Sequence, residues 1–466
     1  MSSPAVLRVA FPFGVLKKDS SLLDPRNTAT TWEYYLLENL GAGLLRDDLS
    51  EAREYAPGLA TAWSQSSPSI WTFEIRQGLK WSDGTPIELS QLAEFFNGLK
   101  NSSARHIANL RLLNDVEVDS TRNLLHFHFR GPVGRGVLHE LSLADAVVVH
   151  PDAAAKGWSL SSGAYTVESY QPDAMKLTLK RNPHSVNIFG DEGPGKVELF
   201  WTKEAEFSSF FTEHKADIFT SGAFSFRKKV LALDNLPLSR IPGYPTAIYY
   251  FQVNPEHEAG ANHAVRRAFT SFVQEYFRAV KLPNILSFED QMVPPGFQGR
   301  LSALKPSSSQ EQLSHLKGLS LNIGLFPQME ELKPIFEGLS LAATEAGFSI
   351  KFEFGGAPTS QRFATVDVFK GNQREASGTW SFLISAPSGP LTPIRKDLES
   401  MLLEMVGSSD SGRSEISSAI HNKILDSGLL IPFMNEIAPM YTSQRVDLSR
   451  WNPFDMRLRF YDVRFK

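Results

Sequence analysis

The feature that most constrains the fold lies late in the chain, where two strand patterns flank a helical one. Residues 319–326 predict a strand, residues 331–346 a helix, and residues 348–354 a second strand. Gly347 follows the helix, at the position where a left-handed glycine commonly ends one. Because parallel strands need a long connection, this unit predicts a parallel pair with a right-handed crossover and an α/β fold.

Similar patterns occur along the rest of the chain. Apolar and polar residues alternate in stretches such as 71–76 and 124–129, which predicts strands with one buried face. Ser90 and Asn262 each precede an apolar stripe with helical spacing, so each is expected to cap a helix. Two late helices are expected on either side of a serine- and glycine-rich loop at 407–412. A chain of 466 residues with this mixture predicts roughly two or three cores.

Composition argues against several classes of function. The chain has 47 basic and 51 acidic residues and no basic block, so a nucleic-acid partner is not expected. It has no cysteine, which excludes disulfides, thiolate nucleophiles and cysteine-bound metals. No stretch approaches the roughly 18 to 20 uninterrupted apolar residues of a membrane-spanning helix.

Catalytic motifs are incomplete wherever they begin. The stretch 407–411 lacks the last glycine of a nucleophile elbow, and the glycine-rich stretch 131–136 lacks the Gly-Lys-Ser/Thr ending of a phosphate-binding loop. The His-Glu pairs at His139 and His257 lack the second histidine of a zinc protease helix. We therefore expect no enzyme, no metal and no cofactor.

Two features, a pair of histidines and the clustered aromatic residues, could belong either to a binding site or to ordinary packing and surface structure. His126 and His128 share one face of a predicted strand and could hold a metal, but a polar outer face is the simpler interpretation. Aromatic residues make up 11% of the chain and cluster at 32–35 and 249–251. They predict either core packing or the walls of a cleft for an organic ligand.

Residues 71–88 carry a resemblance to a known family, with the sequence WTFEIRQGLKWSDGTPIE. This segment closely resembles the signature of the family 5 extracellular solute-binding proteins, the oligopeptide-, dipeptide- and nickel-binding class. Shorter motifs follow the family order along nearly the whole chain, including those at 57–63, 181–183, 251–254 and 430–433.

The resemblance implies an α/β fold of the large type II periplasmic-binding-protein class, with a ligand cleft between two lobes that close about a hinge. It implies a first lobe at 1–46, 160–250 and 433–466, an inserted subdomain at 47–159, and a second lobe at 251–432.

Peptide-binding members of this family often carry a tryptophan followed closely by an aspartate that pairs with the free amino group of the ligand. Trp380 resembles that tryptophan, but Leu383 occupies the aspartate position, and the next acid is Asp397. A buried, unpaired ammonium group is costly. We therefore expect a modified or N-blocked peptide, a sugar-linked peptide or another small organic molecule.

The expected ligand contacts are aromatic side chains and one cation. Trp380, Trp32, Tyr34 and Tyr35 are candidates for stacking, and Arg374 is a candidate partner for a ligand carboxylate. Each also has an interpretation as a core or surface residue.

Family resemblance implies the substrate-binding component of an ABC importer, a monomer that delivers its ligand to a membrane permease. The alternative is a cytoplasmic ligand-sensing domain related to transcription regulators, acting through a partner. The first residues lack the pattern of a secretory signal. We expect a periplasmic or extracellular protein whose export signal lies outside this chain, or else a cytoplasmic one.

Overall fold

The structure is a computed structural model of the chain. It describes residues 5–12, 23–27, 31–47, 55–104, 106–153, 155–156, 158–201, 207–213, 215–302, 313–355, 361–370, 375–385, 389–450 and 458–466. The side chains of residues 31, 32 and 410 are outside this description.

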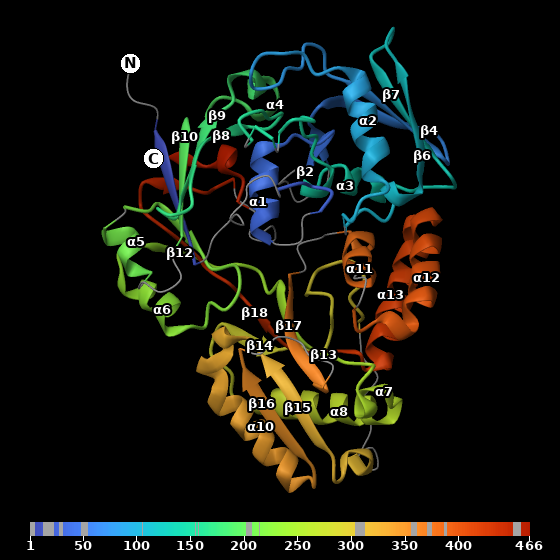
Figure 1. The fold of residues 1–466 in the computed structure, drawn as a ribbon, viewed down its shortest axis with the longest axis vertical. Helices are drawn as coiled ribbons and strands as arrows, with labels where there is room; N and C mark the ends of the chain where they lie inside the picture. Colours follow the sequence, from blue (N-terminus) through green and yellow to red (C-terminus); the bar gives the residue numbers. More distant parts are fainter. Residues whose placement is uncertain are drawn as a thin grey trace.

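A seven-stranded sheet occupies the upper left of the molecule and contains strands from both ends of the chain (Figure 1). β1 runs parallel to β10 and β11, whereas β8, β9, β12 and β19 pair antiparallel to their neighbours. In spatial order the strands are β12 (Ser239–Ile241), β19 (Met440–Thr442), β11 (Ile218–Thr220), β1 (Val6–Phe11), β10 (Lys196–Trp201), β9 (Lys176–Arg181) and β8 (Tyr165–Gln171).

A six-stranded sheet forms the lower part of the molecule and includes the strand, helix and strand unit expected from sequence (Figure 1). β15 and β16 are parallel and in register, which confirms that prediction. In spatial order the strands are β14 (Leu286–Phe288), β18 (Leu430–Glu436), β13 (Ala247–Val253), β17 (Ala364–Lys370), β15 (Ser320–Leu325) and β16 (Ser349–Phe354).

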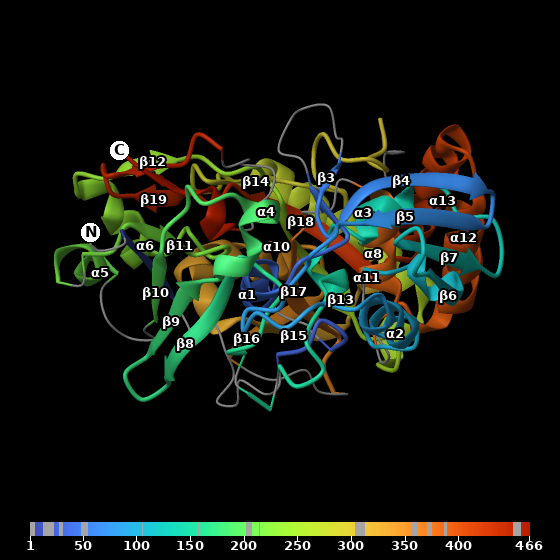
Figure 2. The same ribbon diagram turned by 90° about the horizontal axis from the view of Figure 1, so that it is seen from above.

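A four-stranded antiparallel sheet lies at the upper right, and Figure 2 shows it at the opposite end from the seven-stranded sheet. Its strands, in spatial order, are β4 (Ala60–Ser67), β5 (Ile70–Ile75), β7 (Leu124–Phe129) and β6 (Leu113–Asp119). Two antiparallel pairs complete the strands that the structure describes: β2 (Leu45–Asp47) with β3 (Tyr55–Pro57), and β20 (Val446–Asp447) with β21 (Arg464–Phe465).

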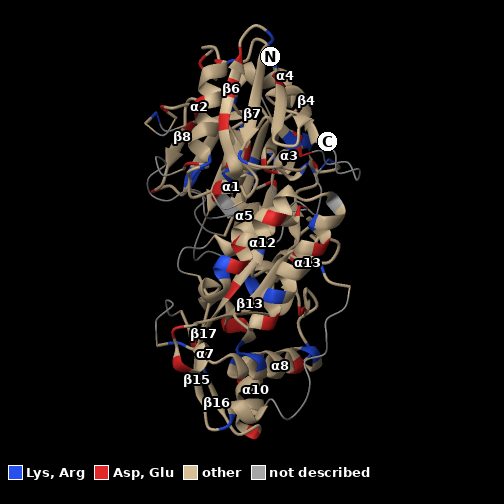
Figure 3. Ribbon diagram, turned by 90° about the vertical axis from the view of Figure 1, so that its right-hand side faces the viewer, with Lys and Arg blue, Asp and Glu red and all other residues tan. Residues whose placement is uncertain are grey.

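Helices cover the sheets and fill the space between them. The described α-helices are α1 (Thr31–Leu40), α2 (Leu89–Leu99), α3 (Gly136–Glu140), α4 (Val186–Phe189), α5 (Ser208–Thr212), α6 (Lys228–Leu231), α7 (Glu258–Ala261), α8 (His263–Ala279), α10 (Lys333–Glu345), α11 (Ala376–Ile384), α12 (Arg395–Gly407) and α13 (Asp410–Ser427). None of them is long and apolar enough to cross a membrane. We call α11, α12 and α13 the helical layer, because Figure 1 places them between the four-stranded sheet and α8, and Figure 3 shows α12 and α13 in the same position.

Three hydrophobic clusters hold these parts together. The largest joins the seven- and four-stranded sheets with the helical layer, and the second lies around the six-stranded sheet, α8 and α10. A small aromatic cluster around Phe207, Phe219 and Tyr441 packs beside β11 and β19. Because the helical layer shares its core with the four-stranded sheet, parts that are distant in sequence are joined by buried apolar contact.

Candidate functional site

The candidate site lies where α1, the four-stranded sheet's loops and the helical layer meet. Asp145 accepts a hydrogen bond from the Tyr34 hydroxyl at 3.3 Å and contacts Nδ1 of His106 at 3.0 Å. The His106 ring stacks on Phe382 of α11, with centroids 4.8 Å apart and planes 16° from parallel. Asp145 and the His106 ring therefore connect Tyr34 of α1 to Phe382 of α11.

A second buried carboxylate lies nearby, at the end of α3. Glu140 accepts hydrogen bonds from the backbone NH of Asn109 at 2.7 Å, from its Nδ2 at 2.6 Å, and from the NH of Leu110 at 2.8 Å. Burial raises the pKa of Glu140 to about 8, and these three hydrogen bonds act in the opposite direction. Glu140 therefore orders the loop that faces the helical layer.

A chain of polar contacts continues from that loop into the helical layer. Asn109 Nδ2 lies 3.4 Å from the hydroxyl of Ser377, which donates to Glu375 at 3.2 Å. Glu375 forms an ion pair with Arg413 of α13, whose side chain is only 3% exposed. We call Asn109, Ser377, Glu375 and Arg413 the latch, because together they join the four-stranded sheet to the helical layer.

Two glycines make room for the latch. A Cβ atom on Gly136 would collide with Nη2 of Arg413, and one on Gly134 would lie 3.3 Å from Nη1. The backbone NH of Gly134 also donates to the carbonyl of Val406 in α12 at 3.1 Å. The glycine-rich stretch that only partly matched a phosphate-binding loop thus allows close approach of an arginine.

The chain passes between the two large sheets through crossing segments anchored by Glu436. This residue ends β18, and its carboxylate accepts from the NH groups of Phe224 at 2.8 Å and Ser225 at 2.7 Å. The Tyr249 hydroxyl donates to the same carboxylate. Because residues 221–227 follow β11 of the seven-stranded sheet, Glu436 fastens that connection to the six-stranded sheet.

Lys370 contributes a second charge at this junction. It ends β17 and, like Glu436, pairs in register with Ala247 of β13. Burial lowers the pKa of Lys370 to about 8, while the charge of Glu436 opposes that shift. The two charged groups therefore flank the same point of the central strand.

The residues predicted as ligand contacts have different surroundings. Trp380 is fully buried, donates its indole NH to Ser417 Oγ at 2.8 Å, and lies 5.3 Å from the His421 ring. Tyr34 belongs to the Asp145 contact, and Tyr35 is buried in the core.

Trp32 lies in α1, but its side chain is outside the described residues, as is the whole of Arg374. Leu383, at the position expected for an aspartate, is 8% exposed within the core of the helical layer.

The two histidines of β7 have protein partners. His126 contacts the Thr72 hydroxyl at 2.9 Å, and His128 contacts Glu117 at 3.0 Å. Within the residues that the structure describes, no group of three or more metal-binding side chains occurs.

Comparison with known proteins identifies similar sequences and folds. Residues 54–273 match the family described as bacterial extracellular solute-binding proteins, family 5 Middle. The Escherichia coli murein peptide-binding protein MppA is 36% identical over 72 residues, which are 16% of this chain and 13% of MppA. The oligopeptide-binding protein OppA of Escherichia coli is 40% identical over 65 residues, 14% of this chain and 12% of OppA.

Solved structures match over almost their whole length. Escherichia coli MppA aligns with a TM-score of 0.80 at 18% identity, covering 100% of this chain and 99% of that one. Haemophilus influenzae OppA in complex with a peptide gives the same TM-score at 14% identity and the same coverage. The unliganded open form of MppA, at 18% identity and covering 100% of this chain and 98% of that one, gives only 0.67.

Proposed function

We propose a function from one premise, that the chain belongs to the bacterial extracellular solute-binding proteins of family 5. Members of this family bind substrates and are not enzymes. The chain would capture a small peptide-like or other organic solute between two lobes and close around it. The observation that carries this proposal is the full-length match of the fold to MppA and OppA.

Closure is supported by the contacts between the two halves of the molecule. The latch and the His106–Phe382 stack join the four-stranded sheet to the helical layer, whose α13 contacts β18 of the six-stranded sheet and α8. Such contacts require the halves to be close together, and the lower TM-score with the open form of MppA agrees with this arrangement. The hinge would lie at the crossing segments beside Glu436, because few chain passages connect the two large sheets there.

The chemistry of the site favours a solute without a free amino terminus. Leu383 is apolar and cannot pair with an ammonium group. The described carboxylates Asp145, Glu140 and Glu375 are already engaged by donors of the protein. An N-blocked or modified peptide, a sugar-linked peptide, or another small organic molecule would leave no buried ammonium unpaired.

Several finer assignments belong to the same proposal. Trp380, Trp32, Tyr34, Tyr35 and Arg374 remain our candidates for contact with the solute, directly or after rearrangement. The lobes would follow the boundaries expected from the family. No cofactor is needed for such binding.

Transport is the biological role that we propose. The loaded protein, as a monomer, would deliver its solute to an ABC permease in the membrane, and it would act in the periplasm or outside the cell. The curated relatives MppA and OppA are named as periplasmic proteins, which supports this location. A cytoplasmic sensor is the alternative; cell fractionation of the natively expressed protein distinguishes the two.

Native mass spectrometry of freshly purified protein tests the proposal. We expect a complex with one small molecule, released on denaturation, because burial in a closed cleft slows dissociation. Titration calorimetry with matched free and N-acetylated tripeptides then tests the solute chemistry, and preference for the free amine would contradict our expectation. Cleavage of any of these peptides would contradict the assignment as a binding protein.

A further inference from the structure

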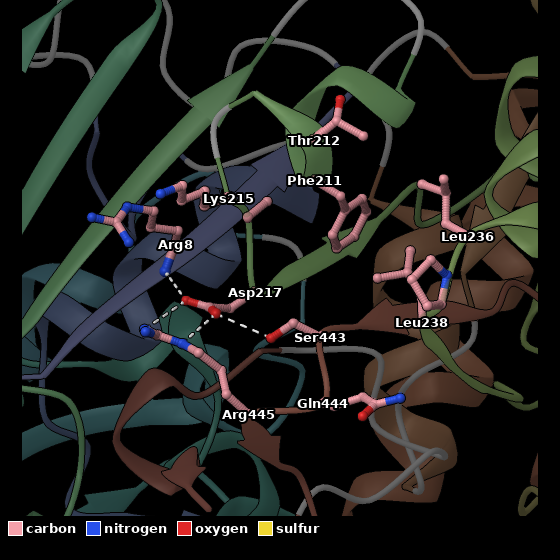
Figure 4. Close-up of a pocket in the computed structure, with 12 residues that line it drawn as sticks. Arg8, Phe211, Thr212, Lys215, Asp217, Leu236, Leu238, Ser443, Gln444 and Arg445 are labelled. Carbon is pink, nitrogen blue, oxygen red and sulfur yellow. Dashed lines mark hydrogen bonds and ion pairs between the residues drawn. The ribbon is translucent and has the colours of Figure 1, made fainter.

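A separate pocket opens on the seven-stranded sheet (Figure 4). It has a volume of about 560 Å³, within the roughly 300 to 1,000 Å³ of typical small-molecule sites. Asp217 of the pocket precedes β11 and Ser443 follows β19, whereas the crossing segments adjoin the other ends of these strands. The pocket is therefore remote from the hinge along both strands.

One side of the pocket carries most of its charge. Arg445 pairs with Asp217, with Nε 2.6 Å from Oδ1, and Asp217 also accepts from the backbone NH of Arg8 at 2.9 Å. The Arg8 guanidinium pairs with Glu198 at 3.2 Å. Lys215 is exposed, and it has no ion pair to any described residue. Glu198 is shared with Lys176, whose Nζ lies 2.8 Å from its other oxygen, so it does not fully neutralise Arg8. Because Arg8, Lys215 and Arg445 face a single lining carboxylate, Asp217, the pocket keeps a net positive charge.

The opposite side is apolar. Phe211, Leu236 and Leu238 are half-buried and pack against the small aromatic cluster. Figure 4 shows them on one side, with Arg8, Lys215 and Arg445 on the other. An apolar wall facing an unbalanced cation suits a ligand with an apolar body and one anionic end.

We propose that this pocket binds a small aliphatic carboxylate. The aliphatic chain would cover Phe211, Leu236 and Leu238, and the carboxylate would lie toward Lys215. Each methylene removed from water would strengthen binding by up to about fourfold. The proposal is independent of solute capture between the lobes, because none of these residues belongs to the latch or the crossing segments.

Titration calorimetry of the whole protein with hexanoate, octanoate and octylamine tests this site. We expect saturable binding of octanoate, weaker binding of hexanoate, and none of octylamine, because the amine repels Lys215. Lys215→Glu and Leu238→Asp are each expected to weaken octanoate binding at least fivefold. Lys156→Glu, an exposed charge reversal elsewhere, serves as the matched control and should change nothing.

Other results would overturn the proposal. These are the absence of saturation at millimolar octanoate, equal binding of octylamine, or unchanged octanoate affinity in both pocket variants. Loss of octanoate binding in Gly136→Ala would place the ligand between the lobes instead. Lys215→Glu should still bind the solute between the lobes. A result against octanoate binding at this pocket can therefore be told apart from a result against solute capture.

Discussion

At the scale of single residues, Gly136 tests whether the latch depends on close approach. Its Cβ would collide with the buried guanidinium of Arg413, whereas a Cβ on Gly131 meets nothing within 4 Å. Gly136→Ala should weaken solute affinity about 5- to 150-fold, since overpacking typically costs about 1–3 kcal/mol and would fall on the closed form. Calorimetry with the molecule released from the purified protein measures the change. Gly131→Ala is the matched control, and an equal effect of both substitutions would refute the latch.

His421 predicts a pH dependence of stability. Its Nε2 accepts from the NH of Met292 at 3.0 Å and Nδ1 lies 3.1 Å from the carbonyl of Gly299, which fixes a neutral ring. Burial lowers its pKa from 6.5 to about 4. The unfolded chain therefore takes up a proton first, and stability present above pH 6.5 is lost as the pH falls toward 4.

The loss attributable to His421 should approach about 3 kcal/mol at pH 4. Urea unfolding between pH 7 and pH 4 measures it. His421→Gln can keep both hydrogen bonds without titrating, so its stability should fall less steeply than that of the natural protein. Identical slopes for the two proteins would exclude this histidine as the cause.

At the scale of elements, the crossing segment depends on the charge at the end of β18. Glu436→Gln would replace one acceptor oxygen by a donor facing the NH groups of Phe224 and Ser225. We expect unfolding free energy to fall by about 1–3 kcal/mol, because a buried donor is left unpaired. Chemical denaturation is the measurement.

Glu192→Gln is a suitable control for Glu436→Gln. Glu192 is 60% exposed and pairs with Arg464 at the surface, where an ion pair contributes about 0–1 kcal/mol. If both substitutions cost the same, the crossing segment does not depend on Glu436.

Helices and strands whose apolar residues recur at regular spacing could be predicted from the sequence. The residues at which helices begin depended on individual hydrogen bonds of polar side chains and were harder to predict. Asn262 caps α8 as expected, accepting from Ala264 NH at 2.9 Å. However, α2 begins at Leu89, before the expected cap at Ser90. The run 407–412 was predicted to be a loop, but α13 begins within it because the Ser409 hydroxyl accepts from Gly412 NH. Serine is found in loops and at helix starts alike, so composition did not decide between them.

At the scale of the whole molecule, the fold was predictable but the latch was not. The fold follows from periodic patterns and from motifs whose order runs along the chain. Asn109, Glu375 and Arg413 meet only through tertiary packing, and no spacing in the sequence links them. An aromatic residue is equally suited to a core or a cleft, so Trp380 could not be assigned from its identity alone. Its contact with a solute remains a prediction.

Lobe closure can be measured directly, because the chain contains no cysteine and spin labels can be placed at two chosen sites. Asp173→Cys in the turn between β8 and β9 and Leu341→Cys in α10 would mark the two halves at exposed positions. Electron–electron distance measurements should show one short distance with solute bound. Removing the solute should add a longer distance from an open form, since the solute stabilises the closed form and its loss shifts the population toward the open one.

A variant that breaks the latch tests whether the latch stabilises the closed form. Arg413→Gln removes the ion pair with Glu375, so the short-distance population without solute should fall. A shift of 1.4 kcal/mol corresponds to about a tenfold change in the ratio of the two states. Lys351→Gln, at an exposed charge outside the latch, should leave the ratio unchanged. A single distance in every sample would mean that the two halves form one rigid body, and solute would then have to enter without hinge motion.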